Sequence, residues 1–381
     1  MMRPRAAVAH GGGPTAVLNA SLAGVIDGCR HRMGALLGAR FGLGGLLSGD
    51  VTDLLRLPQS AVDAAAREPG SAIGSSRRAF DEAGYNLLLD ALRRHRIDIL
   101  FYTGGNGSMD TAREIAARAR AARYDLQVIG IPKTIDNDLL VTHRTPGYAS
   151  TAYFFACAAR DIGMDNRSLP SPVCVLETLG RNSGWITAAT SLARREPDAA
   201  PHLIYLPERR IALDRIAADV ERIYRRLGRV VIAVCEGQRD DHGQPFGAEV
   251  DRAGSAVHAL ASNLGHTLAR RITQMTGLRA RAEKPGLLGR SCGPFTRESD
   301  RRDAYECGLA AARAALAGET DVMVALHATA GTFLTPLSSV ARAERTLPLD
   351  WIAPDGNDVL SAFREYAAPL IGEVGAYEPM F

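Results

Sequence analysis

The chain has 381 residues, of which 46% are hydrophobic and 23% are charged, and its formal net charge is +3. The composition is that of a globular protein, the length favours two domains, and the charge is too small to indicate nucleic-acid binding. No apolar run reaches the roughly 18 residues that a membrane-spanning helix needs. The first ten residues contain no apolar segment of a secretion signal, and the six cysteines lie far apart without a C-x-x-C pair. We therefore expect a cytoplasmic protein with reduced thiols and no membrane or nucleic-acid partner.

The first 140 or so residues repeat one pattern: an apolar strand, a glycine-rich or polar turn, and a helix. The expected strands are residues 6–9, 35–39, 97–102 and 126–129, and the expected helices are 17–29, 87–95 and 109–123. Residues 41–47 read as a mobile loop and 70–78 as a second polar loop. This alternation predicts a doubly wound parallel sheet whose turns gather at one edge.

The next part of the chain continues the alternation and predicts a second α/β lobe, with strands at 173–177, 202–206 and 230–234 and helices at 149–162, 186–194 and 213–226. Further along, helices are expected at 264–275 and 300–316 and a strand at 322–326. Residues 240–244 and 254–255 read as exposed loops, and 279–286 as a basic segment without clear periodicity.

The most informative stretch is 130–138, directly after the strand at 126–129. We expect that strand to stop at Gly130 and Pro132, and Lys133, Thr134, Asp136 and Asp138 follow. Ligands of open α/β sheets bind at the carboxyl ends of strands. One amine and two carboxylates there could neutralise a phosphate, hold a metal and accept a proton. The same residue types also favour turns and helix starts, so this stretch alone leaves both readings open.

Other turns add groups of the same kind. Glycine-rich turns at 11–15 and 103–108 open helices, where backbone amides can approach a phosphate. The first of these turns has neither the Walker nor the G-x-G-x-x-G spacing. Arg77, Arg181 and Glu236 lie in further polar turns. Together these residues supply the charge neutralisation, metal ligands and base that phosphoryl transfer requires, whereas no Ser-His or Cys-His arrangement suggests covalent catalysis.

On these stretches the sequence resembles the phosphofructokinase family. The matching segments are 12–19, 104–108, 132–138, 146–148, 177–185 and 235–237, in the family's order. The expected fold is α/β, with two Rossmann-like lobes, each a mostly parallel sheet flanked by helices, and an active site in the cleft between them. We expect residues 1–147 plus about 290–345 to bind the phosphoryl donor, and 148–289 plus the C-terminal tail to bind the sugar phosphate.

The resemblance implies phosphoryl transfer to the C1 hydroxyl of fructose 6-phosphate, with Mg²⁺ as cofactor. It makes Asp136 the general base, assisted by Asp138. It also implies that Arg181, Arg77 and Lys133 stabilise the negative charge of the phosphoryl group during transfer. The implied donor-phosphate cradle is Gly12, Gly107, Ser108, Arg77 and Lys133. The implied sugar-phosphate ligands are Thr134, Gly180, Arg181, Glu236, Arg281 and Arg290. Asn106 and Asp138 would hold the metal, and the family's shared site implies a homodimer or homotetramer.

The donor remains open between pyrophosphate and ATP. Family members that use ATP usually carry glycine at the positions of Gly107 and Lys133, whereas pyrophosphate users usually carry aspartate and lysine. This chain combines the two patterns. Lys133 places a cation where an inorganic phosphate would lie, while Gly107 leaves room for a nucleotide. The forms of the 13–19 and 104–106 segments resemble the pyrophosphate-type branch, so we predict pyrophosphate and keep ATP as the alternative.

Several residues depart from the family pattern. Asn106 replaces an aspartate that binds Mg²⁺, Pro172 and Leu287 replace an arginine and a histidine, and 291–292 replace a glycine pair. Most of these changes lie on the acceptor side, so a longer sugar phosphate such as sedoheptulose 7-phosphate is an alternative acceptor. A non-catalytic paralogue that binds sugar phosphates and regulates a partner is the alternative from a different functional class.

Overall fold

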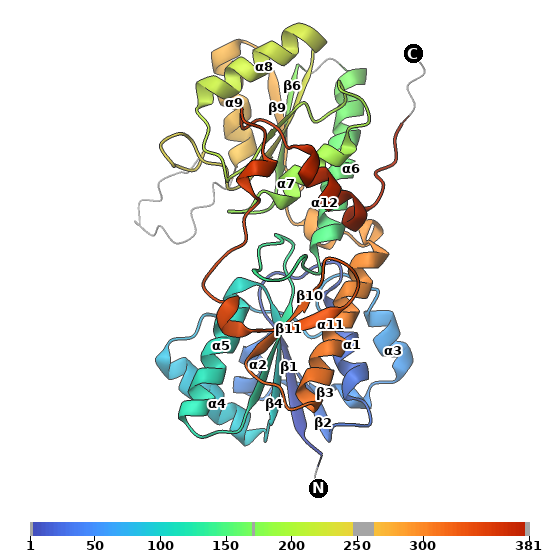
Figure 1. Ribbon diagram of the computed structural model, residues 1–381, viewed down its shortest axis with the longest axis vertical. Helices are drawn as coiled ribbons and strands as arrows, with labels where there is room; N and C mark the ends of the chain where they lie inside the picture. The colour runs from blue at the N-terminus through green and yellow to red at the C-terminus, as the bar shows by residue number, and fades with distance from the viewer. Residues whose placement is uncertain (1–2, 170–171, 247–262, 378–381) are drawn as a thin grey trace. The chain divides into compact units, whose positions relative to one another are not determined.

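A computed structural model describes residues 3–169, 172–246 and 263–377. The chain divides into two compact units, and each of them draws on two separate stretches of sequence. The first unit is Met1–Tyr148 with Arg290–Arg345, and the second is Ala149–Gly289 with Thr346–Phe381. Each unit is an α/β structure with a sheet flanked by helices (Figure 1). The predicted fold class is confirmed.

The sheet of the first unit has seven strands in the order β11-β10-β5-β4-β1-β2-β3. They are β1 (Arg5–His10), β2 (Ala35–Ala39), β3 (Val51–Asp53), β4 (Ile99–Gly104), β5 (Gln127–Pro132), β10 (Val322–Leu326) and β11 (Thr332–Pro336). The five central strands run parallel, and the two edge strands are antiparallel. Because β2 and β4 flank β1 on opposite sides, the strand order reverses there, and such a switch point is where open α/β sheets bind ligands.

Helices cover both faces of this sheet (Figure 1). On one face lie α1 (Leu18–Cys29), α3 (Gln59–Ala65) and α11 (Glu298–Leu316); on the other lie α2 (Leu43–Ser48), α4 (Glu82–Arg94) and α5 (Asn106–Ala121). Alternate residues of β1 serve the two cores: Ala7 joins the α4–α5 side and Val8 the α1–α11 side. This is the period of two expected for a strand that is buried on both faces.

The second unit has a four-stranded, fully parallel sheet in the order β7-β8-β6-β9. Its strands are β6 (Val173–Thr178), β7 (Leu203–Tyr205), β8 (Val230–Cys235) and β9 (Ala280–Glu283). Its helices are α6 (Tyr148–Ser168), α7 (Trp185–Ala189), α8 (Leu213–Leu227), α9 (Leu264–Thr276) and α12 (Ser361–Ile371). Apolar residues of α8 and α9 pack on one face of the sheet. The short α10 (Leu288–Ser291) contains the point where the chain re-enters the first unit.

Most predicted elements are confirmed, two local predictions are wrong, and one strand was not predicted. Residues 41–47 are not a mobile loop, because Leu43 and Leu46 bury their side chains and α2 forms around them. The basic segment 279–286, for which no element was predicted, contains the strand β9, which pairs with β6. The strand before Lys133 does not stop at Gly130 but pairs with β4 through Pro132. The predicted loop at 254–255 lies outside the described residues, and no helix within the described ranges is long and apolar enough to cross a bilayer.

Candidate active site

Three turns of the first unit meet at the carboxyl ends of β1, β4 and β5. A Cβ atom on Gly11 would lie 2.3 Å from Ser108 Oγ, and one on Gly104 would lie 2.0 Å from the same oxygen. Both distances are far below contact, so only glycine lets the turns after β1 and β4 close around Ser108. The Ser108 hydroxyl also hydrogen-bonds the Tyr102 hydroxyl. Ser108, a predicted donor ligand, is therefore buried inside the turn packing.

Lys133 lies beneath the first of these turns and is only 3% exposed. Its Nζ donates hydrogen bonds to the carbonyl oxygens of Gly11 and Gly13, each at 2.7 Å. The pKa of Lys133 is lowered to about 7, chiefly by burial, with Asp136 opposing the shift and Arg290 and Arg77 contributing to it. An ammonium group has three N–H donors, and these carbonyls use two of them. An anionic ligand would therefore accept a hydrogen bond from the third N–H group and would favour the protonated form of Lys133.

Two guanidinium groups reach the same turn. A Cβ atom on Gly13 would lie 2.9 Å from Arg290 Nη1 and 3.4 Å from Arg77 Nη2. Arg77, Lys133 and Arg290 thus surround residues 11–13, the predicted donor turn. Arg290 was predicted to bind the sugar 6-phosphate; it lies in the first unit beside Gly13, and its ligand stays a prediction. Sequence reasoning did not place it with the donor residues.

The two remaining predicted donor ligands, Gly12 and Gly107, differ in how open they are to a ligand. The Gly12 amide donates to the carbonyl of Ser76 at 2.9 Å, so this N–H is already engaged. Gly107 lies in the first turn of α5, and apart from its neighbours and the backbone of its own helix no described atom lies within 4 Å of where its Cβ would be. The start of a helix with open space above it suits an anion.

The acidic turn after β5 is shaped by Asn137. This residue is fully buried and has φ = 54°, in the left-handed region that asparagine tolerates better than most residues. The Asp136 amide donates to Thr134 Oγ1 at 3.1 Å. Asp136 also lies near enough to Lys133 to raise its pKa. Sequence reasoning named the two flanking aspartates and missed Asn137, although an asparagine between two polar turn residues is a signal for a left-handed position.

Asp138 and Asn106 form the predicted metal pair. Asn106 Nδ2 donates to the backbone carbonyl of Asp138 at 3.1 Å, so the two residues are in contact. The Oδ1 atoms of both side chains are buried without a hydrogen-bond partner. Burial raises the pKa of Asp138, and Glu344 adds to this, while hydrogen bonds from Thr134 and Asn106 oppose it. Two buried, unsatisfied oxygen atoms fit a hard cation such as Mg²⁺, which commonly takes one or two protein oxygens and completes its shell with phosphates and water.

No larger metal centre accompanies this pair. Across the described residues, no three His, Cys, Asp or Glu side chains cluster as metal ligands. A cation held by Asp138 and Asn106 would therefore depend on oxygens of the donor, and its binding would be weak without donor.

The second unit gathers a different set of groups at the ends of β6 and β8. The Glu236 carboxylate accepts hydrogen bonds from the backbone amides of Arg181 and Gly180, and burial followed by the charge of Glu177 raises its pKa. Gly180 and Arg181 both have positive φ, 135° and 51°. The sharp turn after β6 is thus held against Glu236, as the prediction of a shared sugar site requires.

A buried ion pair beside this turn was missed by sequence reasoning. Lys284 Nζ lies 2.7 Å from Glu177 Oε1, and the Gly265 amide donates to Glu177 Oε2 at 2.7 Å. The available signal was that Lys133 and Lys284 are the only lysines of the chain. Arg281 points to the opposite face of the sheet, because side chains alternate along β9, and it lies 4.0 Å from Asp165 of α6. The structure therefore groups Gly180, Arg181 and Glu236 but not Arg281.

Comparison with known proteins identifies the family. Residues 5–324 match the family model described as phosphofructokinase. The chain belongs to the phosphofructokinase family. It is 38% identical to a pyrophosphate–fructose 6-phosphate 1-phosphotransferase of Rhodospirillum rubrum, over 98% of this chain and 95% of the relative. It is 31% identical to a sulfofructose kinase of Alkalicoccus urumqiensis, over 85% and 83% of the two chains. The crystal structure of a pyrophosphate-dependent phosphofructokinase from Marinobacter aquaeolei matches with a TM-score of 0.87 and 30% identity, over 99% of this chain and 93% of that one.

Proposed function

We infer that this phosphofructokinase family member transfers a phosphoryl group from pyrophosphate to the C1 hydroxyl of fructose 6-phosphate, giving fructose 1,6-bisphosphate and orthophosphate. The observation that carries the donor choice is the buried ammonium of Lys133 beneath residues 11–13, with Arg77 and Arg290 beside it. A small, highly charged inorganic donor matches three cations in one turn better than the diffuse charge of a nucleotide. Four relatives named for pyrophosphate share 33–38% identity with this chain.

Each group then has a role in the transfer. Asp136 accepts the C1 hydroxyl proton as the sugar oxygen attacks the nearer phosphorus of pyrophosphate, and orthophosphate leaves. Lys133, Arg77 and Arg290 balance the charge that develops on the transferred and leaving groups. Arg181 with Glu236 and Gly180 orients the acceptor. The first unit is thus the proposed donor-binding part and the second the proposed sugar-phosphate-binding part.

Mg²⁺ is the proposed cofactor, held by Asp138 and Asn106. When bound, it supplies a Lewis acid that withdraws charge from the phosphate oxygens. The chain's own contribution is one carboxylate oxygen and one amide oxygen, both buried without a hydrogen-bond partner, on two residues that are in contact. Cytoplasmic location and assembly into a homodimer or homotetramer, with Thr134, Arg281 and the acceptor residues completing a shared site, belong to the same proposal.

The deciding experiment is a donor swap. Purified protein with Mg²⁺ and fructose 6-phosphate receives pyrophosphate in one arm and ATP in the other, and fructose 1,6-bisphosphate is measured in both. We expect kcat/KM with pyrophosphate to exceed that with ATP by at least tenfold. Faster turnover with ATP would overturn the donor assignment. Sugar-phosphate binding without turnover in either arm would favour the regulatory paralogue.

A further candidate acceptor is 6-deoxy-6-sulfofructose, and the observation that favours it is Leu287. This residue stands where the family has a histidine, and it is 64% exposed. Loss of that cation lowers the positive charge available for a dianionic 6-phosphate, and a relative of this chain is named sulfofructose kinase. A sulfonate carries one negative charge rather than two. The acceptor panel therefore includes fructose 6-phosphate, sedoheptulose 7-phosphate and 6-deoxy-6-sulfofructose, and the highest kcat/KM assigns the acceptor.

A further inference from the structure

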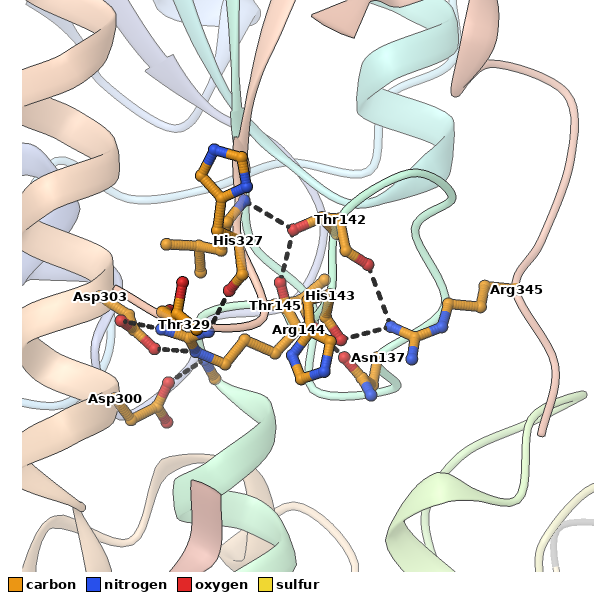
Figure 2. A network of polar contacts seen from close by, with 12 residues as sticks. Asn137, Thr142, His143, Arg144, Thr145, Asp300, Asp303, His327, Thr329 and Arg345 are labelled. Atoms are coloured by element: carbon orange, nitrogen blue, oxygen red, sulfur yellow. Dashed lines mark hydrogen bonds and ion pairs between the residues drawn. The ribbon is translucent and has the colours of Figure 1, made fainter. Parts of the chain in front are cut away.

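Residues 137–147 connect the acidic turn after β5 to helix α6, and polar contacts tie this segment to three distant parts of the first unit. Figure 2 shows these contacts reaching α11, the chain after β10 and Arg345. At the end of the segment, the Gly147 amide donates to Asp300 Oδ1 of α11 at 2.8 Å. Thr145 Oγ1 donates to the carbonyl of Thr134 at 2.8 Å, which links the end of the segment to the acidic turn before it. The turn that carries Asp136 and Asp138 is thus held by hydrogen bonds from the far end of the segment.

Arg144 anchors the middle of the segment to α11. Its Nε and Nη2 donate to the two carboxylate oxygens of Asp303 at 2.5 and 2.8 Å, and its Nη1 donates to the carbonyl of His327 at 2.6 Å. The Arg144 side chain is 13% exposed. A two-pronged guanidinium–carboxylate contact fixes orientation as well as distance. Arg144 therefore holds the segment in one position relative to α11 and β10.

Arg345 holds the part of the segment nearest to the metal pair. Its backbone amide donates to the carbonyl of Asp138 at 2.7 Å, and its Nη1 donates to the carbonyls of Thr142 and His143 at 3.1 and 2.7 Å. The same Asp138 carbonyl accepts the hydrogen bond from Asn106. Arg345 therefore spans residues 138–143 and also fixes the backbone to which the Asp138 carboxylate is attached. It is the last residue of the first unit before the chain continues at Thr346.

We propose that Arg144, through Asp303, and Arg345 are positioning residues for phosphoryl transfer, because together they fix the backbone that carries Asp136 and Asp138. The inference rests on the proposed function. Misplacing a reacting group by about 1 Å costs roughly 100-fold in rate. These arginines act through the 137–147 segment, so their loss lowers kcat and weakens Mg²⁺ activation rather than the binding of either substrate.

The difficulty is that breaking any buried ion pair also destabilises a protein. The second unit supplies a matched control. Arg194 donates to both oxygens of Asp358 at 2.7 and 2.6 Å, and its side chain is 14% exposed. This pair is also bidentate and its arginine is about as buried as Arg144, although Arg194 uses Nη1 and Nη2 where Arg144 uses Nε and Nη2. Within the described residues, neither member of the pair bonds the 137–147 segment. Arg194→Met therefore reports the stability cost of losing such a pair without the positioning effect.

The experiment compares Arg144→Met, Asp303→Asn, Arg345→Met and Arg194→Met in the full chain. We measure kcat, the two KM values, the Mg²⁺ concentration for half-activation, Tm, and hydrogen–deuterium exchange of residues 134–147. Arg144→Met and Asp303→Asn are expected to lower kcat roughly 10- to 100-fold and to raise the Mg²⁺ requirement, with both KM values within about threefold. Arg144→Lys, which keeps the charge but loses the fork, should recover part of kcat. Arg345→Met keeps its backbone bond and should show a smaller loss.

Arg194→Met should lose a similar amount of Tm while its kcat stays within about twofold of wild type. The inference is overturned if kcat follows Tm alike in the Arg144 and Arg194 variants, or if exchange of 134–147 is unchanged in Arg144→Met. The exchange comparison needs no turnover, and if Arg144→Met does not fold, Asp303→Asn and Arg345→Met carry the test. A wild-type protein inactive with every donor would refute the proposed function alone, because the exchange result would still decide the positioning role.

Discussion

The carboxyl ends of the two sheets carry differently charged groups, and the partners of the chain's two lysines show this difference best. In the first unit, Lys133 bonds two neutral carbonyl oxygens, and burial lowers its pKa to about 7. In the second unit, Lys284 bonds the buried carboxylate of Glu177. The charge of Lys284 is thus already balanced within the protein, whereas the charge of Lys133 is stabilised fully only when an anion arrives. The same parallel architecture therefore carries the proposed anion site in one unit and the proposed, carboxylate-rich site for sugar hydroxyls in the other.

The largest effect is expected at the one carboxylate assigned to the chemistry. Asp136→Asn keeps the shape of the side chain and removes the base, so kcat should fall by about 10³-fold while both KM values change little. Steady-state kinetics measure this, with the exposed Asp125→Asn as control. A loss of less than tenfold would remove Asp136 from its role and would weaken the assignment of proton transfer to the first unit.

Exchanging each lysine for methionine tests the contrast directly. Lys133→Met should lower kcat/KM for pyrophosphate about 10- to 100-fold, as expected for one lost charge-assisted hydrogen bond. Lys284→Met should leave donor kinetics within about threefold and lower Tm, because Glu177 would remain buried without its counter-charge. If Lys284→Met impairs donor use as much as Lys133→Met does, the division of labour between the units is wrong.

The strand ends were predictable and the side-chain partners were not. Apolar runs followed by glycine or polar residues placed Lys133 and Glu236 at the ends of strands, since burial on both faces leaves a clear pattern. The pattern failed at β9, where Arg281 and Glu283 are exposed on one face and only Ala280 and Ala282 face the core. No sequence period places Lys284 beside Glu177 or Arg290 beside Gly13, because those contacts depend on which strands become neighbours.

The pH dependence of donor binding sharpens the comparison further. The pKa of Lys133 lies at about 7, below its ordinary value, so the ammonium form that attracts pyrophosphate is lost as pH rises through 7. A bound anion favours the charged form, so binding above that pH should take up protons. Donor KM should rise about fivefold between pH 7 and 8, because the protonated fraction of a group with a pKa of about 7 falls by that factor. Calorimetry in buffers of different ionisation enthalpy should show the uptake. Lys133→Met should abolish both effects, and unchanged donor KM over this range would contradict the account.

The smallest expected effect contrasts two aspartates. Burial raises the pKa of Asp138, so its carboxylate costs stability at neutral pH, and this cost disappears below the pKa of the unfolded state, where the group is protonated in both states. For Asp219 of the second unit, burial is outweighed by hydrogen bonds from Arg222 and Asn357, and its pKa is lowered. Its carboxylate therefore stabilises the fold above the unfolded pKa, and the benefit is lost as pH falls through the folded one.

Substituting each aspartate by asparagine should move Tm in opposite directions. At pH 7 without Mg²⁺, Asp138→Asn should raise Tm by about 2–4 °C per kcal/mol relieved, while Asp219→Asn should lower it. Both differences should shrink as pH is lowered towards 4. Mg²⁺ with pyrophosphate should raise the Tm of wild type but not that of Asp138→Asn, since binding to the folded state alone is what stabilises it. A lower Tm for Asp138→Asn at pH 7 would mean that the charge of the Asp138 carboxylate is already compensated by other groups of the protein. The proposed difference between the two units, an uncompensated charged site in the first and compensated ones in the second, would then be wrong.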